Sequence, residues 1–361
     1  MDKKKWLIIY VSAGEGHRRA AEALYRYIKE NSKEIDVIIF DALDFSNFLF
    51  KIFYRKGYNF LVKKLPSLWR VAYTLTRFKF LTPIRFCVNR VATSGLKKYI
   101  LRCKPDKILT THFLPAEVLS YLKRRGLLSS FLAVVITDFV PHPFWIFKEV
   151  DRFFVASYFS RNKLILYGID EYKISITGIP VNLNFSLDLD KKGLYKKLNL
   201  REDLFTVLIV TAGFGLGPIE KLVKILYNQV QLMVVCGYNQ RLFRKLKKNY
   251  PNIKVFGFVE NMEELMSVCN IIITKPGGLT ISEALVKDVP MIFISPIFGQ
   301  ETENIRIMEG LGIGKALKDV YKIKEFILRC KANPEIISSI IRKISSIKKP
   351  YAVKEIVCAL R

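Results

Sequence analysis

The stretch T-K-P-G-G-L-T-I-S-E at residues 274–283 decides the fold of the second half of the chain. It follows an apolar run of strand length and leads into a helical pattern. Its two adjacent glycines allow a ligand to approach the backbone, and the following helix presents unpaired N–H groups, so the turn suits an anion such as a diphosphate. Thr280 and Glu283 also fit a T-x-x-E capping box, which would satisfy those donors without a ligand. We favour the anion site because a cap does not account for two adjacent glycines.

The same alternation of strand and helix patterns extends outward from this turn through almost the whole chain. It predicts an α/β fold in which parallel sheets are covered by helices. In the second half, strands are expected near residues 205–210, 232–236, 254–256, 271–274 and 291–294. In the first half, they are expected near residues 7–11, 36–40, 107–111, 133–137 and 152–155. Ligands of such folds bind at the carboxyl ends of strands, so the functional residues are expected there, in a cleft between two facing halves.

A chain of 361 residues exceeds what one hydrophobic core usually organises, which predicts two Rossmann-like domains. A polar stretch after Gly178-Ile179-Pro180 lacks both the helical and the strand period, and it is therefore expected to be a linker. We predict an N-terminal domain at residues 1–179, a linker at 180–200 and a C-terminal domain at 201–344. A final helix at 345–361 is expected to pack back on the N-terminal domain.

The charge balance points to an anionic partner. With 59 basic and 32 acidic residues, the formal net charge is +27, which suits nucleic acid, anionic lipid or a phosphate-bearing substrate. The six cysteines are scattered without a C-x-x-C pair or clustered histidines, so no zinc site is expected. The first apolar run stops at Ala13 without a cleavage pattern, and no apolar stretch has the length of a membrane span. We expect a cytoplasmic protein that is soluble or peripheral.

Residues 45–105 contain no acidic side chain and interleave basic with aromatic ones. Aromatic rings that insert at the headgroup boundary, beside cations drawn to anionic lipid, explain both features and favour membrane docking. Single-strand nucleic-acid binding is an alternative, as is a solvated helical surface whose rings pack inward. The membrane and acceptor candidates are Phe48, Phe53, Tyr54, Arg55, Lys63, Lys64, Trp69, Arg77, Phe78 and, outside the segment, Trp145.

His17 is the strongest catalytic candidate among the three histidines. It lies in the first turn of the helix that follows the first strand, and a helix amino terminus disfavours the imidazolium, so the neutral ring could accept a proton. Asp138 follows a strand and could orient His17 or act as the base itself, although aspartate is also a routine turn residue there. His112 follows a strand as well and is expected near the cleft, whereas His142 is consistent with a loop.

Two further motifs carry weaker signals. A second glycine-rich turn at residues 213–218 follows a strand and is a weak indication of a phosphate contact. Asp188 and Asp190 match the D-x-D pattern of metal-dependent sugar transferases, but they lie in the expected linker, so no metal site is predicted.

Taken together, these residues resemble the diacylglycerol glycosyltransferases, the family of plant monogalactosyldiacylglycerol synthases and bacterial processive diacylglycerol glucosyltransferases. The chain is more distantly similar to the peptidoglycan glycosyltransferase MurG. The likeness covers most of the chain and is best at residues 12–21, 135–145, 174–180, 234–239 and 257–304. The last of these is the most specific, with G-F-V at 257–259, M-E-E-L at 262–265, T-K-P-G-G at 274–278 and G-Q-E at 299–301.

The resemblance implies a GT-B fold, inverting transfer from a UDP-sugar and a lipid acceptor held by the N-terminal half. It places His17 at the position of the family's proposed base. By resemblance, Glu283 contacts the ribose hydroxyls, Phe258 and Val259 line the uracil site, Gly277, Gly278 and Thr280 lie at the diphosphate, and Gln300 and Glu301 read the sugar with Asn304 nearby. The donor site is completed by Gly16, Gly213, Phe214, Gly215, Gly237, Asn239 and Lys275, although the turn around Phe214 departs from the family's usual form.

We therefore predict an enzyme that transfers a hexose from UDP to diacylglycerol or glycosyl-diacylglycerol at the cytoplasmic face of the cell membrane, forming a β-linked glycolipid. Glucose is preferred over galactose because residues 274–278 look more like the bacterial members than the plant ones. An anionic phospholipid surface is expected as partner, with neither nucleic acid nor a metal cofactor. The alternatives are a MurG-like UDP-N-acetylglucosamine transferase acting on a polyprenyl-linked acceptor and a nucleic-acid-binding protein on a degenerate GT-B scaffold.

Overall fold

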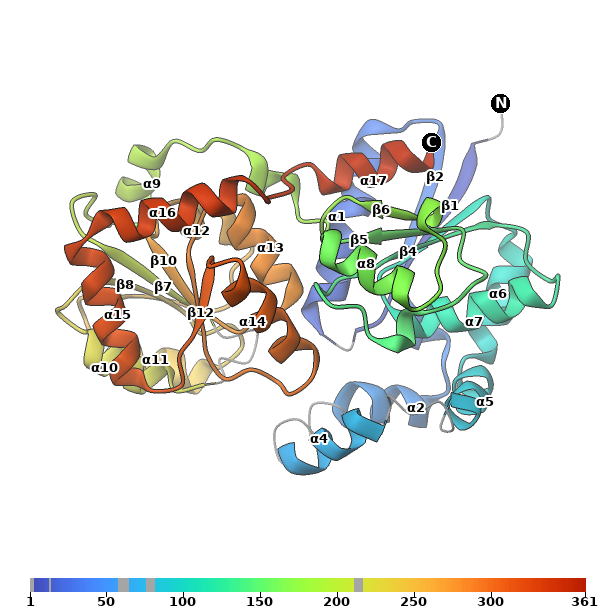
Figure 1. Cartoon of the computed structure of the whole chain (residues 1–361), viewed down its shortest axis with the longest axis horizontal. Helices are drawn as coiled ribbons and strands as arrows, with labels where there is room; N and C mark the ends of the chain where they lie inside the picture. The colour runs from blue at the N-terminus through green and yellow to red at the C-terminus, as the bar shows by residue number, and fades with distance from the viewer. Residues whose placement is uncertain (1–2, 13, 58–64, 76–81, 211–216) are drawn as a thin grey trace. The chain divides into compact units, whose positions relative to one another are not determined.

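The computed structural model describes residues 3–12, 14–57, 65–75, 82–210 and 217–361, and it comprises two compact α/β units (Figure 1). The first unit contains residues 1–183, 297–300 and 351–361, and the second contains residues 184–296 and 301–350. Each unit has one six-stranded sheet, and all strand pairs in both sheets are parallel. The predicted α/β class is confirmed.

The first sheet has the strand order β2-β1-β3-β4-β5-β6. Its strands are β1 (Lys4–Tyr10), β2 (Ile35–Asp41), β3 (Lys107–Thr110), β4 (Phe131–Val135), β5 (Arg152–Val155) and β6 (Ile174–Ile176). The central strands are almost continuously apolar and buried, as expected when helices cover both faces of a sheet. The order reverses between β1 and β3, which is where ligands of open α/β sheets bind.

The helices of the first unit follow its strands or belong to the basic aromatic segment. They are α1 (Glu15–Asn31), α2 (Phe48–Ile52), α4 (Pro66–Leu75), α5 (Thr82–Ala92), α6 (Ser94–Cys103), α7 (Phe113–Arg124), α8 (Tyr158–Leu166) and α17 (Ala352–Leu360), with a π-helical turn η2 (Phe53–Gly57) and 3₁₀ turns η1 (Ala42–Phe45), η4 (Pro143–Trp145) and η5 (Glu171–Lys173).

The second sheet has the order β12-β11-β10-β7-β8-β9 and reverses between β10 and β7. Its strands are β7 (Thr206–Val210), β8 (Gln231–Val235), β9 (Lys254–Phe256), β10 (Ile271–Thr274), β11 (Met291–Phe293) and β12 (Gly314–Ala316). The helices are α9 (Lys191–Lys197), α10 (Ile219–Leu226), α11 (Gln240–Asn249), α12 (Met262–Ser267), α13 (Gly278–Val286), α14 (Gln300–Gly310), α15 (Val320–Ala332) and α16 (Pro334–Ser345). In α10, buried residues recur at positions 219, 222, 223 and 226, the spacing of one helical face.

The structure differs from the sequence-based expectation in two places. It contains two edge strands that the pattern did not indicate, β6 and β12, each of three residues. The segment 180–200, expected to be a linker without regular structure, carries a 3₁₀ turn, η6 (Leu183–Ser186), and helix α9.

Helix α17 is part of the core of the first unit. Val353, Ile356, Val357 and Leu360 are buried in one cluster with residues of β1 and α1. At its end, the Arg361 guanidinium donates a hydrogen bond to the carbonyl oxygen of Asn31, 2.8 Å away. Helix α17 thus packs in the core formed by β1 and α1.

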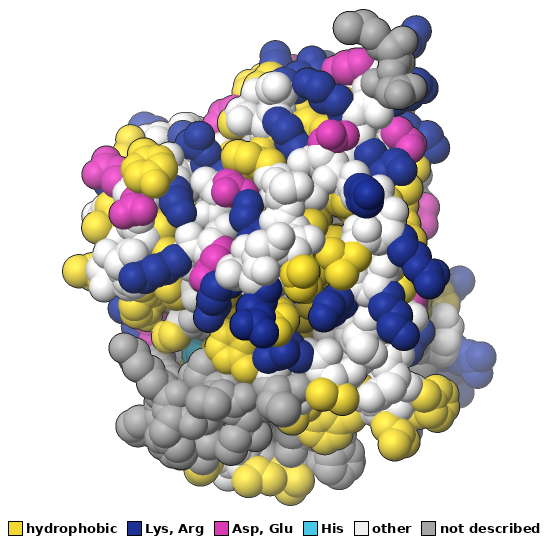
Figure 2. Space-filling view, turned by 90° about the vertical axis from the view of Figure 1, so that its right-hand side faces the viewer, with side chains coloured by type: hydrophobic (Ala, Val, Ile, Leu, Met, Phe, Trp, Pro, Cys, Tyr) yellow, Lys and Arg dark blue, Asp and Glu magenta, His cyan; other side chains and the backbone are white. Residues whose placement is uncertain are grey.

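Part of the basic aromatic segment exposes apolar side chains. Phe48 and Leu49 on α2 are 74% and 78% exposed, and Phe53 at the start of η2 is 67% exposed. Leu68 and Val71 on α4 are exposed as well. Figure 2 shows hydrophobic side chains gathered at the lower edge of one face, with Lys and Arg spread above them. Within the described part of the chain, no helix is long and apolar enough to cross a membrane.

Candidate active site

His17 is held in one tautomer at the carboxyl edge of the first sheet. Its Nδ1 lies 2.8 Å from the carbonyl oxygen of Thr111, and because a carbonyl can only accept, Nδ1 carries the hydrogen. The Thr137 hydroxyl lies 2.8 Å from the same nitrogen, and the Thr111 hydroxyl donates to the backbone carbonyl of His17. The lone pair of the neutral ring is therefore on Nε2.

Burial keeps this ring neutral. The pKa of His17 is lowered to about 4, chiefly because the charged form loses its hydration, while the hydrogen bond to Thr111 opposes the shift. The sequence had suggested the helix amino terminus as the cause, but desolvation is the dominant one. A neutral imidazole with a free Nε2 lone pair can accept a proton from a hydroxyl group.

Asp138 follows β4 and is partly buried, next in the chain to Thr137. The sequence offered it as the group that orients His17. Nδ1 of His17 contacts Thr111 and Thr137, two residues that the sequence reasoning missed. Both roles of Asp138, orienting His17 and acting as the base itself, stay predictions.

A second histidine packs against the first. His112 begins α7 as its N-cap, and its ring contacts that of His17 edge to face with centroids 4.7 Å apart. The Nδ1 atom of His112 accepts a hydrogen bond from the backbone N–H of Leu114 at 3.1 Å. Burial, followed by the proximity of His17, lowers the pKa of His112 well below the ordinary histidine value. It is therefore neutral as well.

Trp145 is corrected as a membrane candidate, because its side chain is fully buried. Its ring packs against both histidines, with centroid distances of 6.3 Å to each. The indole N–H is buried and has no hydrogen-bond partner among the residues that the structure describes. Trp145 thus forms a wall behind the two histidines rather than an exposed anchor.

Tyr54 lies beside His112 and next in the chain to the exposed Phe53. Its half-buried ring lies 6.0 Å from that of His112, centroid to centroid, and it follows the exposed Phe53 in the chain.

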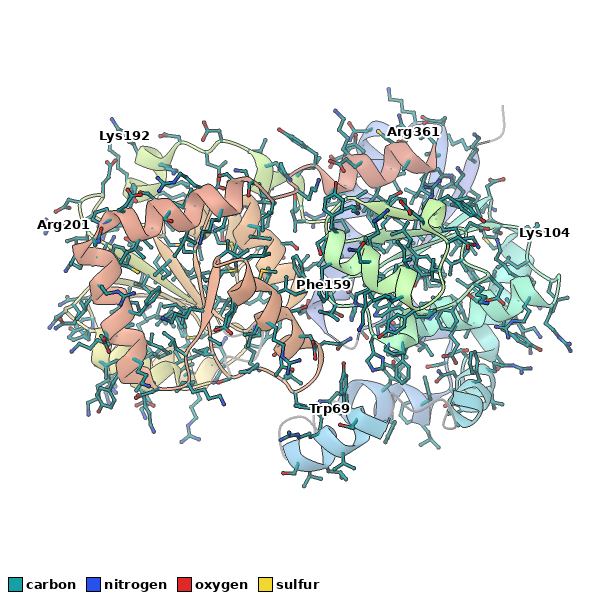
Figure 3. All side chains as sticks on the ribbon, in the orientation of Figure 1. Trp69, Lys104, Phe159, Lys192, Arg201 and Arg361 are labelled. Carbon is teal, nitrogen blue, oxygen red and sulfur yellow. The ribbon has the colours of Figure 1, made fainter. Side chains whose placement is uncertain are left out.

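Trp69, another membrane and acceptor candidate, is half-buried. Its indole Nε1 donates to the backbone carbonyl of Phe298 at 3.1 Å, a contact within the first unit. Figure 3 labels Trp69 on α4. Gly299 follows with φ of 109°, and a Cβ there would lie 2.5 Å from the ring of Tyr73, so only glycine fits. Of the remaining membrane candidates, Lys63, Lys64, Arg77 and Phe78 lie outside the described residues, as does the side chain of Arg55.

In the second unit, the turn after β10 leads into helix α13, whose N-terminus has no side-chain cap. Helix α13 begins at Gly278, and its N-cap is Gly277, which contributes no side-chain hydrogen bond. The capping box, which the sequence offered as an alternative to the anion site, is not formed, because Thr280 lies inside the first turn instead of at the cap. A Cβ on Gly277 would meet no heavy atom within 4 Å. The first-turn N–H groups thus lack a side-chain cap, and the backbone can be approached closely, as an anion site requires.

Helix α14 contributes a hydrogen bond that holds the turn after β10 in place. Asn304 is fully buried, and its amide donates to the carbonyl oxygen of Pro276 at 3.0 Å. Ser282 donates to the carbonyl oxygen of Gly278 at 3.0 Å. Asn304, predicted to lie near the donor sugar, thus holds the backbone of the turn in place.

The parallel sheet brings most of the predicted donor residues to one edge, since they follow the carboxyl ends of β8, β9, β10 and β11. Within the second unit these residues are Gly237, Asn239, Phe258, Val259, Lys275, Gly277, Gly278, Thr280, Glu283, Glu301 and Asn304. Gln300 begins α14 within the first unit, and Gly16 lies beside His17 in α1. Gly213, Phe214 and Gly215 lie outside the described residues.

Tyr238 is a residue of this edge that sequence reasoning missed. Its ring stacks on that of Phe258, with centroids 4.7 Å apart and an angle of 14° between the planes. Both rings are exposed. Beside them, Asn239 caps α11 by accepting a hydrogen bond from the N–H of Leu242. No sequence signal distinguishes Tyr238, because the contact depends on the pairing of β8 with β9.

Comparison with known proteins gives consistent relatives for both units. Residues 17–181 match the family Monogalactosyldiacylglycerol (MGDG) synthase, and residues 217–312 match the Glycosyltransferase family 28 C-terminal domain. A processive diacylglycerol beta-glucosyltransferase of Bacillus cereus is 33% identical over 326 residues, covering 87% of this chain and 82% of the relative. A probable chloroplastic monogalactosyldiacylglycerol synthase of Nicotiana tabacum is 34% identical over 347 residues, covering 90% of this chain and 64% of the relative.

Solved structures share the fold along the whole chain. MurG of Acinetobacter baumannii superimposes with a TM-score of 0.64 at 15% identity, covering 99% of each chain. HepE of Anabaena, solved in complex with UDP, superimposes with a TM-score of 0.57 at 14% identity, covering 99% of each chain.

Proposed function

Because this chain belongs to the diacylglycerol glycosyltransferase family and has a GT-B fold, it is a glycolipid glycosyltransferase, and we propose that it transfers glucose from UDP-glucose to diacylglycerol. The observation that carries the proposal is the pair of sites: a neutral histidine with a free Nε2 lone pair in the first unit, and an open helix start after β10 in the second. The first suits a hydroxyl nucleophile and the second a diphosphate leaving group.

The proposed reaction is a single inverting displacement. The acceptor hydroxyl oxygen forms a bond to the anomeric carbon while its proton passes to Nε2 of His17. The bond from that carbon to the UDP oxygen breaks, and the electron pair leaves with the diphosphate. Inversion of an α-linked donor gives a β-linked glycolipid. The uncapped N–H groups at the start of α13 would stabilise the leaving charge, so we propose that transfer requires no metal.

The donor sugar is proposed as glucose, with galactose as the second choice. The preference rests on the likeness of residues 274–278 to the bacterial members of the family. We propose that Phe258 and Tyr238 lie at the uracil, since their exposed, stacked rings stand at the edge where the donor is expected.

The acceptor side is proposed to work at a membrane surface. The exposed apolar rings of Phe48 and Phe53 lie in a segment without acidic residues, in a chain of net charge +27. Such rings insert at the headgroup boundary while basic side chains attract anionic phospholipid. Tyr54 follows Phe53 in the chain, and its ring lies 6.0 Å from that of His112. We propose that the acceptor hydroxyl passes beside Tyr54 to reach the base.

A labelled-donor assay tests the proposal. Purified protein with diacylglycerol in phosphatidylglycerol vesicles and EDTA is expected to form glucosyl-diacylglycerol from UDP-glucose, with less product from UDP-galactose and none from UDP-N-acetylglucosamine. His17→Ala should lower turnover by a factor on the order of 100 to 10,000, the usual contribution of a general base, without weakening UDP binding. Product only from UDP-N-acetylglucosamine and a polyprenyl-linked acceptor would instead support the MurG-like alternative. Unchanged turnover in His17→Ala would remove His17 from the mechanism.

A further inference from the structure

The two neighbouring histidines lie where the strand order of the first sheet reverses. His17 follows β1 by way of the first turn of α1, and His112 directly follows β3 and Thr111. Since β1 and β3 are adjacent and parallel, their carboxyl ends open onto the same crevice. Both rings therefore stand at the position where this fold class places its ligands.

The fixed tautomers of the two rings are complementary. His17 carries its hydrogen on Nδ1, bonded to the Thr111 carbonyl, and leaves a lone pair on Nε2. His112 accepts at Nδ1 from Leu114, so its hydrogen is on Nε2. The pair thus presents one acceptor and one donor from rings in contact.

Among the described residues, none accepts a hydrogen bond from the N–H donor of His112. The side chain is 3% exposed, yet its Nε2 has no hydrogen-bond partner in the part of the chain that the structure describes. Capping α7 needs only Nδ1, and asparagine or serine serves that purpose at least as well.

We propose that Nε2 of His112 donates a hydrogen bond to the acceptor hydroxyl whose proton His17 removes. This inference rests on the proposed function and adds a second histidine to the acceptor site. A hydroxyl has one hydrogen and two lone pairs. Its hydrogen faces His17, one lone pair receives the hydrogen bond from His112, and the other is left to attack the anomeric carbon. The two rings together thus fix the orientation of the nucleophile.

Two substitutions separate this role from helix capping. His112→Asn keeps an acceptor at the position of Nδ1, which preserves the cap, but removes the donor at Nε2. His112→Gln reaches further and places an amide N–H near the position of Nε2, while it gives up the cap. A structural role thus predicts that the glutamine variant is the impaired one, and the proposed role predicts the reverse.

The measurements are kcat and KM with UDP-glucose and diacylglycerol vesicles, UDP binding, and thermal unfolding. His112→Asn is expected to unfold like the wild type and bind UDP normally, with kcat lower by a factor on the order of 100, the effect of losing one well-placed donor. His112→Gln is expected to retain kcat within about tenfold even if it unfolds at a lower temperature.

Wild-type kcat in His112→Asn, or equal loss in both variants while both stay folded, would overturn the role of His112 and leave the proposed function intact. Absence of product from the wild type with every donor and acceptor pair would overturn the proposed function, and the inference with it.

Discussion

At the scale of single residues, the catalytic candidates were visible in the sequence, but their partners were not. His17 stood out because it begins a helix after a strand. Thr111 and Thr137, which fix its tautomer, are ordinary strand-end residues separated from it by 94 and 120 positions. Trp145 was named as a membrane and acceptor candidate, yet packing against the histidines buries its side chain. Such contacts depend on tertiary structure and have no local signal.

The lowered pKa of His17 predicts that activity falls on the acid side at a much lower pH than it would with an ordinary histidine as the base. Because the base must be neutral, kcat/KM should stay level from pH 8 to about 5 and fall as the ring is protonated near its pKa of about 4. Initial rates in overlapping buffers, with circular dichroism to confirm folding, measure the limb. A limb near the ordinary value of about 6.5 would show that the ring is hydrated.

The same shift links pH to stability. The unfolded chain binds the His17 proton near pH 6.5 and the folded chain only near pH 4, so the free energy of unfolding decreases as pH falls through this window.

At the scale of elements, strands and helices followed from the sequence wherever the apolar pattern was long enough. The strands that were predicted, including the three-residue β9 and β11, lie within a few positions of the expected ranges. The three-residue edge strands β6 and β12 were missed. Helix α9 was missed as well: its seven residues contain four lysines and one buried leucine. The T-x-x-E match at residues 280–283 has the form of a cap, but the backbone already enters the helix at Gly278.

The open start of α13 makes Gly277→Ala a sharp test of the anion site. The φ of Gly277 is −72°, and its Cβ position is free of protein atoms, so alanine fits the fold at a cost of about 1 kcal/mol or less at an N-cap. A methyl group placed against a bound diphosphate should weaken UDP binding by about tenfold or more, equivalent to about 1.4 kcal/mol.

Calorimetric titration with UDP measures the effect of Gly277→Ala. Gly310→Ala is the matched control, because Gly310 ends α14, is exposed and also has no heavy atom within 4 Å of its Cβ position. Equal UDP affinity in the Gly277 variant, the control and the wild type would show that the diphosphate does not lie against this turn.

At the scale of the whole molecule, the net charge and the apolar face predict how the protein binds vesicles. The double variant Phe48→Ser/Phe53→Ser should partition onto phosphatidylglycerol vesicles at least about tenfold less than the wild type, since burying one such ring contributes about 1.5–3 kcal/mol. Salt at about 0.5 M should weaken wild-type binding, because it screens the net charge of +27. The Debye length shortens from about 10 Å at 0.1 M to about 3 Å at 1 M.

Sedimentation with vesicles measures this partitioning, and Tyr321→Ser is the control because Tyr321 is similarly exposed, at 70%, on α15 of the second unit. If the control loses as much binding as the double variant, or if neither loses any, the face that carries Phe48 and Phe53 is not the docking surface.

The place of α17 in the first unit has a consequence for the order in which the protein can be completed on the ribosome. Residues 184–296 and 301–350 are synthesised before α17, so almost all of the second unit is available to fold while the first unit still lacks Val353, Ile356, Val357 and Leu360. The unit that contains the beginning of the chain is therefore the last to be finished. Until residue 360 emerges, the nascent chain exposes the apolar face of β1 and α1 that this helix will cover. We expect a chaperone to bind the nascent chain at this face.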